Sequence, residues 1–275
     1  MLFGTWGQFL DHDITLSNEG NTEQVTIQVP RCDEYFDKEC TGKETITYFR
    51  SEYDPKQPIR TNLNQLTTWI DASMIYGSTM EVHNGLRTFK DGKLKTSTGS
   101  LLPIDEQGQF YAGDVRATEN MGLTTLQILF LREHNRLCDL IIAADTNRTI
   151  TDQDIFNIAR NYVIGLIQKI SLDDYLPNLF GKAHFNKYVG SYKTYNESAD
   201  PTITTEFSST AYRIGHPYIP HTYKAVDNNN RTVEKINLLD LLVCNPQTLK
   251  YLRVNTILKG LAFTLAKQRT LDYVD

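Results

Sequence analysis

The stretch that decides the fold reads Trp6-Gly7-Gln8-Phe9-Leu10-Asp11-His12-Asp13, with four polar side chains set in an apolar pattern. If the stretch is helical, Gln8, Asp11 and His12 share one face, because residues three and four apart are neighbours on a helix. Asp13 lies about 140° around the helix from Gln8 and therefore faces elsewhere. An amide, a carboxyl and an imidazole on one face form either a buried hydrogen-bond network or a chemical site, and this stretch alone leaves both interpretations open.

The composition excludes two classes of protein. The chain has 275 residues, of which 40% are hydrophobic and 22% charged, as is usual for a globular protein. Its net charge of −5 argues against nucleic-acid binding, because a surface that follows phosphates needs an excess of basic residues. No apolar stretch approaches the roughly 18 residues of a transmembrane helix. The N-terminus carries no signal peptide, and the helix-like pattern at the C-terminus has no signal that would end a helix. We therefore expect the sequence to be a piece of a longer chain.

The spacing of apolar residues predicts a mainly α-helical single domain with long loops and little β-structure. Helices are expected over residues 2–14, 64–75, 113–144, 152–170, 240–242 and 251–267. Strand-like alternation is confined to residues 24–29 and 45–49, and polar loops are expected over residues 92–109 and 190–205.

The cysteines and the glycosylation sequons favour a secreted protein. Cys32 and Cys40 lie close together in a turn-rich polar segment that suits a small disulfide loop. Cys138 and Cys244 lie in apolar surroundings that suit buried thiols. Neither pair has a histidine at zinc-ligand spacing. Acceptor sequons for N-glycosylation begin at Asn147, Asn196 and Asn230.

A second polar segment, residues 67–73, offers alternating oxygen atoms. Thr67, Asp71 and Ser73 supply side-chain oxygens, with backbone carbonyls between them. Calcium takes about six to eight oxygen ligands, and Asp13 would add a second carboxylate. The alternative is ordinary capping of a helix start by Asp, Ser and Thr. From this segment alone, capping is favoured.

Three further residues are ambiguous when each is taken alone. Arg116 lies three residues before Glu119, and an exposed ion pair is the ordinary explanation for that spacing. His134 lies in the charged run of residues 132–136, which indicates a structural network. His216 follows a glycine and precedes a proline, at a break where its ring can project into a cavity, although a single histidine is usually a core residue.

Taken together, these segments resemble the animal-type haem peroxidases of the peroxidase–cyclooxygenase superfamily, and most closely the peroxinectin-like members. The resemblance rests on residues 6–13, on Asp71-Ala72-Ser73-Met74-Ile75-Tyr76-Gly77-Ser78, on residues 112–116 and 131–137, and on Tyr212-Arg213-Ile214-Gly215-His216. It spans nearly the whole chain. It implies that residues 1–275 belong to one haem peroxidase catalytic domain, truncated at both ends, with the family's mainly helical fold.

The resemblance also implies the chemistry. His12 matches the distal histidine, which takes a proton from hydrogen peroxide and returns it to the leaving oxygen. Arg116 matches the distal arginine, which stabilises the negative charge that develops as the O–O bond breaks. Gln8 matches the distal glutamine, and His216 matches the ligand of the haem iron. The family reaction passes through a ferryl intermediate that oxidises small reductants such as bromide, iodide, thiocyanate or phenols.

Two more groups of residues follow from the same resemblance. Asp11 and Glu119 match the two carboxylates that can form ester links to haem b. The family's calcium site matches Asp13, Thr67, Trp69 (through its carbonyl), Asp71 and Ser73.

Three departures from the family pattern narrow the activity. Asn120 stands where strongly chloride-oxidising members carry a methionine, so chloride oxidation is not expected. Arg213 stands where the fatty-acid dioxygenases place a radical tyrosine, and Tyr212 is one residue too early, which favours a peroxidase. No motif after Leu271 matches the asparagine that supports the proximal histidine.

A third class of function is a non-catalytic adhesion or matrix protein that keeps the fold. The sequence contains neither an Arg-Gly-Asp nor a Lys-Gly-Asp tripeptide, so it gives no support for an integrin partner.

Overall fold

The computed structural model describes residues 1–147, 149–190, 194–219, 221–238, 244 and 246–265. Helix α1 (Leu2–Ile14) has the bounds that its apolar spacing predicts, and it buries Trp6, Phe9 and Leu10. The Phe9 ring stacks on Phe130 with centroids 5.4 Å apart, and Trp6 packs against both rings. This aromatic cluster fixes α1 against helix α4 (Met121–Ala144).

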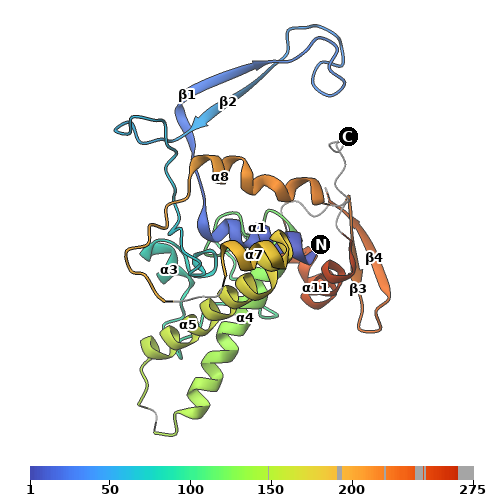
Figure 1. Cartoon of the computed structure of the whole chain (residues 1–275). Coiled ribbons are helices and arrows are strands. Elements are labelled where there is room, and N and C mark those ends of the chain that lie inside the picture. The colour runs from blue at the N-terminus through green and yellow to red at the C-terminus, as the bar shows by residue number, and fades with distance from the viewer. Residues whose placement is uncertain (148, 191–193, 220, 239–243, 245, 266–275) are drawn as a thin grey trace.

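Helix α4 and helix α5 (Asp152–Ile170) run side by side and form the longest paired element of the fold (Figure 1). The prediction for α5 is confirmed, and Thr151 and Asp154 form a capping box at its start. The prediction that a helix covers residues 113–120 is wrong. The Asn120 side chain accepts a hydrogen bond from the Leu123 amide and so fixes the start of α4 at residue 121.

His134 on α4 has a structural role, as expected, but its hydrogen-bond partners are neutral groups and not the charged residues beside it in the sequence. It is fully buried, and its Nε2 lies 2.9 Å from the carbonyl oxygen of Gly92. Because a carbonyl only accepts, Nε2 carries the proton, and Nδ1 accepts from the Tyr76 hydroxyl at 2.9 Å. Through these two hydrogen bonds the neutral ring connects α4 to Gly92, in the loop that follows residue 88, and to Tyr76 in the core.

The predicted helix over residues 64–75 is largely wrong. Only its last residues are helical, in the short helix α2 (Ser73–Tyr76), followed by α3 (Met80–Leu86). Thr68 and Ala72 have positive φ angles of 65° and 61°, which break a right-handed helix. The amides of Ala72 and Ser73 donate to the Asp13 carboxylate, so a side chain of α1 binds the groups that begin α2.

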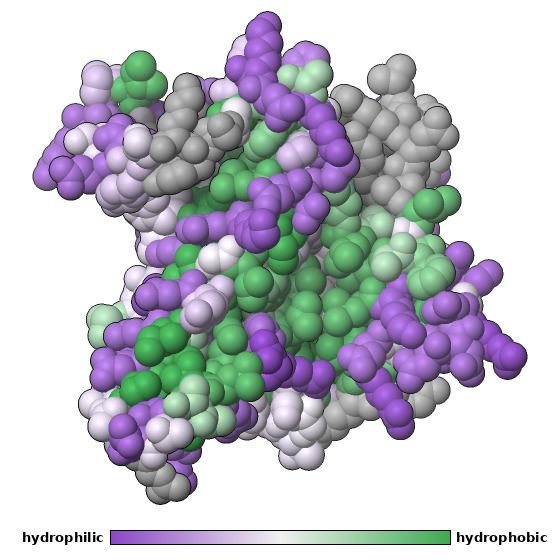
Figure 2. Space-filling view, turned by 60° about the horizontal axis from the view of Figure 1, so that its bottom comes forward, coloured by the Kyte–Doolittle hydropathy of each residue, from purple (hydrophilic) through white to green (hydrophobic). Residues whose placement is uncertain are grey.

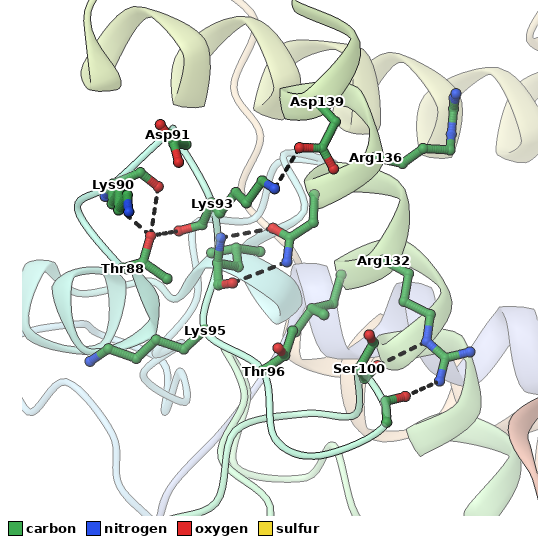
Figure 3. A pocket seen from close by; sticks show the side chains of 14 residues that line it. Thr88, Lys90, Asp91, Lys93, Lys95, Thr96, Ser100, Arg132, Arg136 and Asp139 are labelled. Atoms are coloured by element: carbon green, nitrogen blue, oxygen red, sulfur yellow. Dashed lines mark hydrogen bonds and ion pairs between the residues drawn. The ribbon is translucent and has the colours of Figure 1, made fainter. Parts of the chain in front are cut away.

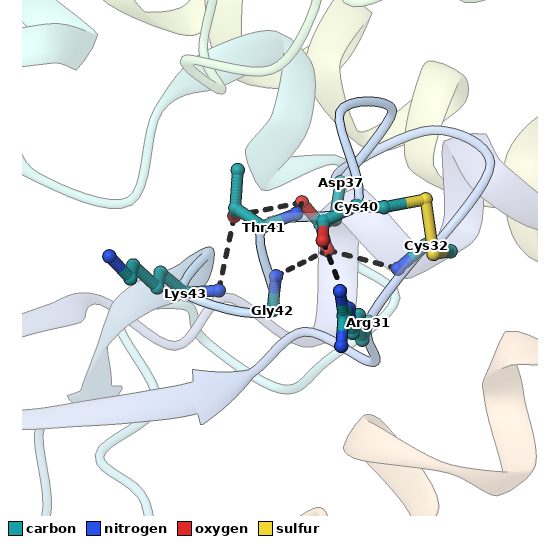
Figure 4. Close-up of a disulfide and its surroundings, with 7 residues drawn as sticks. All are labelled: Arg31, Cys32, Asp37, Cys40, Thr41, Gly42 and Lys43. Carbon is teal, nitrogen blue, oxygen red and sulfur yellow. Dashed lines mark hydrogen bonds between the residues drawn. A yellow bond between two sulfur atoms is a disulfide. The ribbon is translucent and has the colours of Figure 1, made fainter.

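Strands β1 (Glu19–Gln28) and β2 (Thr45–Ser51) confirm the two stretches of strand-like alternation. They pair as an antiparallel ribbon that projects away from the helices (Figure 1). The ribbon ends in a loop closed by the predicted disulfide between Cys32 and Cys40. Inside the loop, the Asp37 carboxylate accepts hydrogen bonds from the amides of Cys32, Thr41 and Gly42 (Figure 4).

The second half of the chain contains a hairpin that the sequence does not predict, made of β3 (Thr222–Val226) and β4 (Thr232–Asn237). Helix α11 (Val254–Phe263) packs on β3, where Gly260 lies so close to the Lys224 carbonyl that a Cβ would collide with it. The predicted helix over residues 251–267 is divided, because Arg253 has a φ angle of 61° between α10 (Pro246–Leu252) and α11. The predicted helix over residues 240–242 lies outside the described residues.

Short helical segments link these elements. They are η1 (Ser171–Tyr175), α6 (Leu176–Phe180), α7 (Lys182–Tyr188), α8 (Thr205–Ser209) and the 3-10 helix η2 (Ala211–Tyr218). The fold is mainly helical with little β-structure, as predicted, and its described strands form two small sheets. Within the described residues, none of the helices has the length and apolar character needed to span a membrane. One face of the molecule gathers apolar side chains flanked by hydrophilic ones (Figure 2).

Candidate active site

The polar face of α1 forms the centre of the site. Gln8, Asp11 and His12 point to the same side of the helix, as their spacing predicts. The Gln8 amide donates to Glu119 Oε2 at 3.0 Å, and His12 Nε2 lies 3.6 Å from the same oxygen. Asp11 Oδ2 lies 3.5 Å from Nη1 of Arg116. The structure therefore brings five of the six predicted haem-site residues together.

A carboxylate holds the Arg116 guanidinium in one orientation. Nε and Nη2 of Arg116 donate to the two oxygens of Asp114 at 3.0 and 2.9 Å. Such a two-point contact fixes the plane of the guanidinium as well as its position. Asp114 is buried and lies 3.7 Å from Nδ1 of His12. The partners of Arg116 are thus Asp114 and Asp11, and the exposed ion pair with Glu119 that the spacing allows does not explain its position.

The Gln8 side chain is held at both ends. Its Nε2 donates to Glu119, and its Oε1 accepts from Nδ2 of Asn120 at 2.8 Å. The sequence did not predict this role of Asn120. Its position before the first residue of α4, where Asn is a preferred cap, is the signal that would have marked it.

Burial sets the protonation states in the site. Burial lowers the pKa of His12 to about 3, and the nearby Arg116 charge acts in the same direction. The ring is therefore neutral at physiological pH and able to accept a proton. Burial raises the pKa of Asp11 and of Glu119, while Arg213 opposes this effect at Asp11 and Arg116 opposes it at Glu119.

The 3-10 helix η2 lies against α1 and carries His216. The Tyr212 hydroxyl donates to the Gly7 carbonyl at 3.0 Å, and Nη1 of Arg213 pairs with Asp11 Oδ2 at 3.2 Å. The His216 side chain is exposed, and no hydrogen bond or ion pair within the described residues joins it to the other predicted site residues. Arg213 is thus the residue that connects the His216 segment to the polar face of α1.

The predicted calcium ligands lie on the opposite side of α1. Asp13 is buried, and its Oδ1 accepts hydrogen bonds from the Ser73 amide and hydroxyl, both at 2.6 Å. Asp71 accepts from the Thr67 hydroxyl at 3.0 Å and from the Ser73 amide at 3.2 Å. The side chain of Trp69 is exposed. In the part of the chain that the structure describes, no group of three or more His, Cys, Asp or Glu side chains could hold a metal ion.

The whole sequence, residues 1–275, matches the family model described as animal haem peroxidase. The chain belongs to the animal haem peroxidase family. This animal haem peroxidase chain is 33% identical over 244 residues to Peroxinectin A of Dictyostelium discoideum, a match that covers 78% of this chain and 44% of that protein. It therefore spans less than half the length of this curated relative.

Solved structures share the fold of this chain. The structure of Peroxidase A from Dictyostelium discoideum superposes with a TM-score of 0.83 and 27% identity, over 97% of this chain and 56% of that one. A fatty acid alpha-dioxygenase from Arabidopsis thaliana superposes with a TM-score of 0.77 and 23% identity, over 96% of this chain and 46% of that one. The second likeness shows that the two proteins share a fold.

Proposed function

We propose that this chain carries the peroxide-binding side of a haem peroxidase that reduces hydrogen peroxide and oxidises small reductants. The observation that carries the proposal is the arrangement of His12 and Arg116. A buried neutral imidazole lies beside a guanidinium that Asp114 fixes in one orientation. Membership of the animal haem peroxidase family supports it.

The residues present fit a bound haem. Asp11 Oδ1 and His12 Nδ1 are buried without a hydrogen-bond partner among the described residues. Such unpaired polar atoms are rare in native proteins, which supports a bound group at this place. Haem, when bound, supplies the redox chemistry of peroxide cleavage. In this proposal His216 holds the iron, and Asp11 and Glu119 hold the edge of the macrocycle, where ester links can form.

The protein's own groups handle the proton and the charge. His12 accepts a proton from hydrogen peroxide and returns it to the oxygen that leaves as water. Arg116 stabilises the negative charge on that oxygen, and its contact with Asp114 means that little reorganisation is needed during the reaction. Gln8, held by Glu119 and Asn120, orients water or a halide beside His12.

We also propose that calcium binds beside Asp13. Its buried carboxylate and that of Asp71, with the hydroxyls of Thr67 and Ser73 and the carbonyl of Trp69, form an oxygen-rich set of the kind that hard cations prefer. Burial raises the pKa of Asp13 to about 7, and the Asp71 charge adds to this effect, so a bound cation would favour the ionised form. The cation would brace α1 one residue after His12.

The expected reductants are bromide, iodide, thiocyanate and phenols. Chloride is not expected among them, because Asn120 stands where the strongly chloride-oxidising members of the family carry a methionine. In the structure Arg213, at the position of the dioxygenases' tyrosine, pairs with Asp11, which favours a peroxidase over a fatty-acid dioxygenase. A non-catalytic matrix protein with the same fold would not need the His12 and Arg116 arrangement.

We also propose that the protein is secreted as a glycoprotein. The Cys32–Cys40 disulfide is present, and such bonds persist in oxidising compartments. The three sequon residues Asn147, Asn196 and Asn230 are all exposed. Because the chain spans less than half of Peroxinectin A, we propose that residues 1–275 are one part of a single catalytic domain.

The test is haem reconstitution followed by His12→Ala. The purified chain should take up haem and show a Soret band, and a band that survives acid-acetone extraction would support ester links through Asp11 and Glu119. His12→Ala should keep the haem and lose peroxide turnover by about 10²- to 10⁴-fold, the usual contribution of a positioned acid–base group. The matched control is His184→Ala on α7, where the side chain is exposed. Full activity in the His12 variant would refute the assignment, and a failure to take up haem would refute the proposal for this chain.

A further inference from the structure

A polar groove, separate from the candidate active site, lies between the loop of residues 88–100 and the middle of helix α4 (Figure 3). It has a volume of about 930 Å³ and is lined by residues of these two segments. None of them belongs to the candidate active site, so the groove calls for a separate explanation.

Hydrogen bonds fasten both walls of the groove to one another. The Asn135 side chain accepts from the Leu94 amide at 2.9 Å and donates to the Leu94 carbonyl at 3.0 Å. Arg132 donates to the carbonyls of Gly99 and Ser100 at 2.9 and 2.8 Å. The shape is therefore fixed before a ligand arrives, which lowers the entropy cost of binding.

The groove is basic although the chain as a whole has a net charge of −5. Two carboxylates line it, those of Asp91 and Asp139, and Lys93 pairs with the second of them. The cationic lining side chains number five: Lys90, Lys93, Lys95, Arg132 and Arg136. Because the net charge of the chain repels a polyanion, any binding of one must come from a local cluster of this kind.

The cations are spread along the groove and are not gathered at one point. Figure 3 shows Lys95 and Arg136 extending outward on opposite sides, with Lys93 reaching across to Asp139. Lys90 and Lys95 are exposed, and no carboxylate of the described residues lies within 4.0 Å of either ammonium group. Lys93 pairs with Asp139 and Arg136 with Glu133, so the ammonium groups left for a ligand are those of Lys90 and of Lys95, the second of which also donates to the Gly85 carbonyl at 2.7 Å. A ligand that reaches both of them must be extended and carry several negative charges.

The uncharged lining residues narrow the ligand class. The hydroxyls of Thr88, Thr96 and Ser100 line the groove, and among the described residues no aromatic side chain does. A nucleic acid bound as a single strand is usually held by aromatic rings on which its bases stack, and these are missing here. Sulfate groups need only cations and hydrogen-bond donors. We propose that this groove binds a sulfated polysaccharide, whose sulfates pair with Lys90 and Lys95.

The test uses a fluorescently labelled heparin oligosaccharide and the full chain. Binding is followed by fluorescence anisotropy at about 0.15 M salt, where interactions beyond the Debye length are screened. The double substitution Lys90→Gln and Lys95→Gln should weaken binding about ten-fold, as expected for two exposed charge contacts. The matched control replaces Lys182 and Lys187 of α7, both exposed, by Gln and should leave binding unchanged.

Two competitors complete the experiment. Desulfated heparin should not displace the probe, and a single-stranded oligodeoxynucleotide of equal charge should displace it poorly. Equal displacement by the oligonucleotide would show unspecific ion exchange and overturn the proposal. So would an equal loss of binding in the two double variants, or the absence of heparin binding by the unmodified chain. Circular dichroism checks that each variant keeps the fold.

Discussion

The buried ring of His134 gives the protein a predictable sensitivity to acid. Burial lowers the pKa of this histidine from 6.5 to about 4, since the neutral ring is enclosed between Tyr76 and Gly92. The unfolded chain therefore binds a proton at higher pH than the folded one. As the pH falls from 6.5 towards 4, the unfolded state gains protons that the folded state does not bind, and the free energy of unfolding decreases.

The size of this effect follows from the pKa difference. One pKa unit corresponds to about 1.4 kcal/mol, so the full loss attributable to His134 is about 3 kcal/mol. Above pH 6.5 the contribution is constant, and below pH 4 it has been lost completely. A loss of this size is a large part of the about 5–15 kcal/mol by which a typical domain is stable.

Urea unfolding at a series of pH values measures the effect, with the fluorescence of Trp6 and Trp69 as the signal. The variant His134→Gln should be less stable at neutral pH, because it loses buried hydrogen bonds. Its stability should nevertheless fall by about 3 kcal/mol less than that of the unmodified chain between pH 7.5 and pH 4. The control His184→Gln should retain the full pH dependence. If the His134 variant and the unmodified chain show the same pH dependence, the reasoning from burial is wrong.

Three further changes have expected outcomes. Asn120→Ala removes the cap of α4 and the hold on Gln8, so thermal unfolding should show a loss of about 1 kcal/mol, and peroxide turnover should fall as well; unchanged stability would contradict the capping role. Calcium should raise the melting temperature of the unmodified chain but not that of Asp13→Asn, and a rise in both would place the cation elsewhere. Replacing Cys32 and Cys40 by Ser should speed amide exchange within residues 30–44 and leave exchange in α4 and α5 unchanged, which hydrogen-exchange mass spectrometry resolves.

The sequence predicted the elements whose apolar spacing is regular and whose contacts are local. The bounds of α1, the identity of its polar face and the separate direction of Asp13 all follow from counting residues around a helix. The helix expected over residues 64–75 failed because the Asp13 carboxylate, some 60 positions away in the sequence, binds the amides of Ala72 and Ser73. A pattern confined to one segment carries no information about such a partner.

The site shows the same division. The residues on α1 and the Arg116 to Glu119 turn could be marked from the sequence. The partners that orient them could not, because Asp114 pairs with Arg116 through side-chain geometry and Arg213 reaches Asp11 across 202 positions. The hairpin of β3 and β4 was missed because its outward side chains are mixed and do not alternate clearly between apolar and polar.

The position of the β1–β2 ribbon has a consequence for how the sequence of such a protein can evolve. Its tip is ordered by the disulfide and by bonds to Asp37 that begin and end within the same loop (Figure 4). Within the part of the chain that the structure describes, the hydrogen bonds of Asp37 and the disulfide stay inside the tip and do not reach the polar face of α1. Substitutions there can therefore alter what the protruding tip touches at little cost to the geometry around His12, so the outer surface and the chemistry of the interior are free to evolve separately.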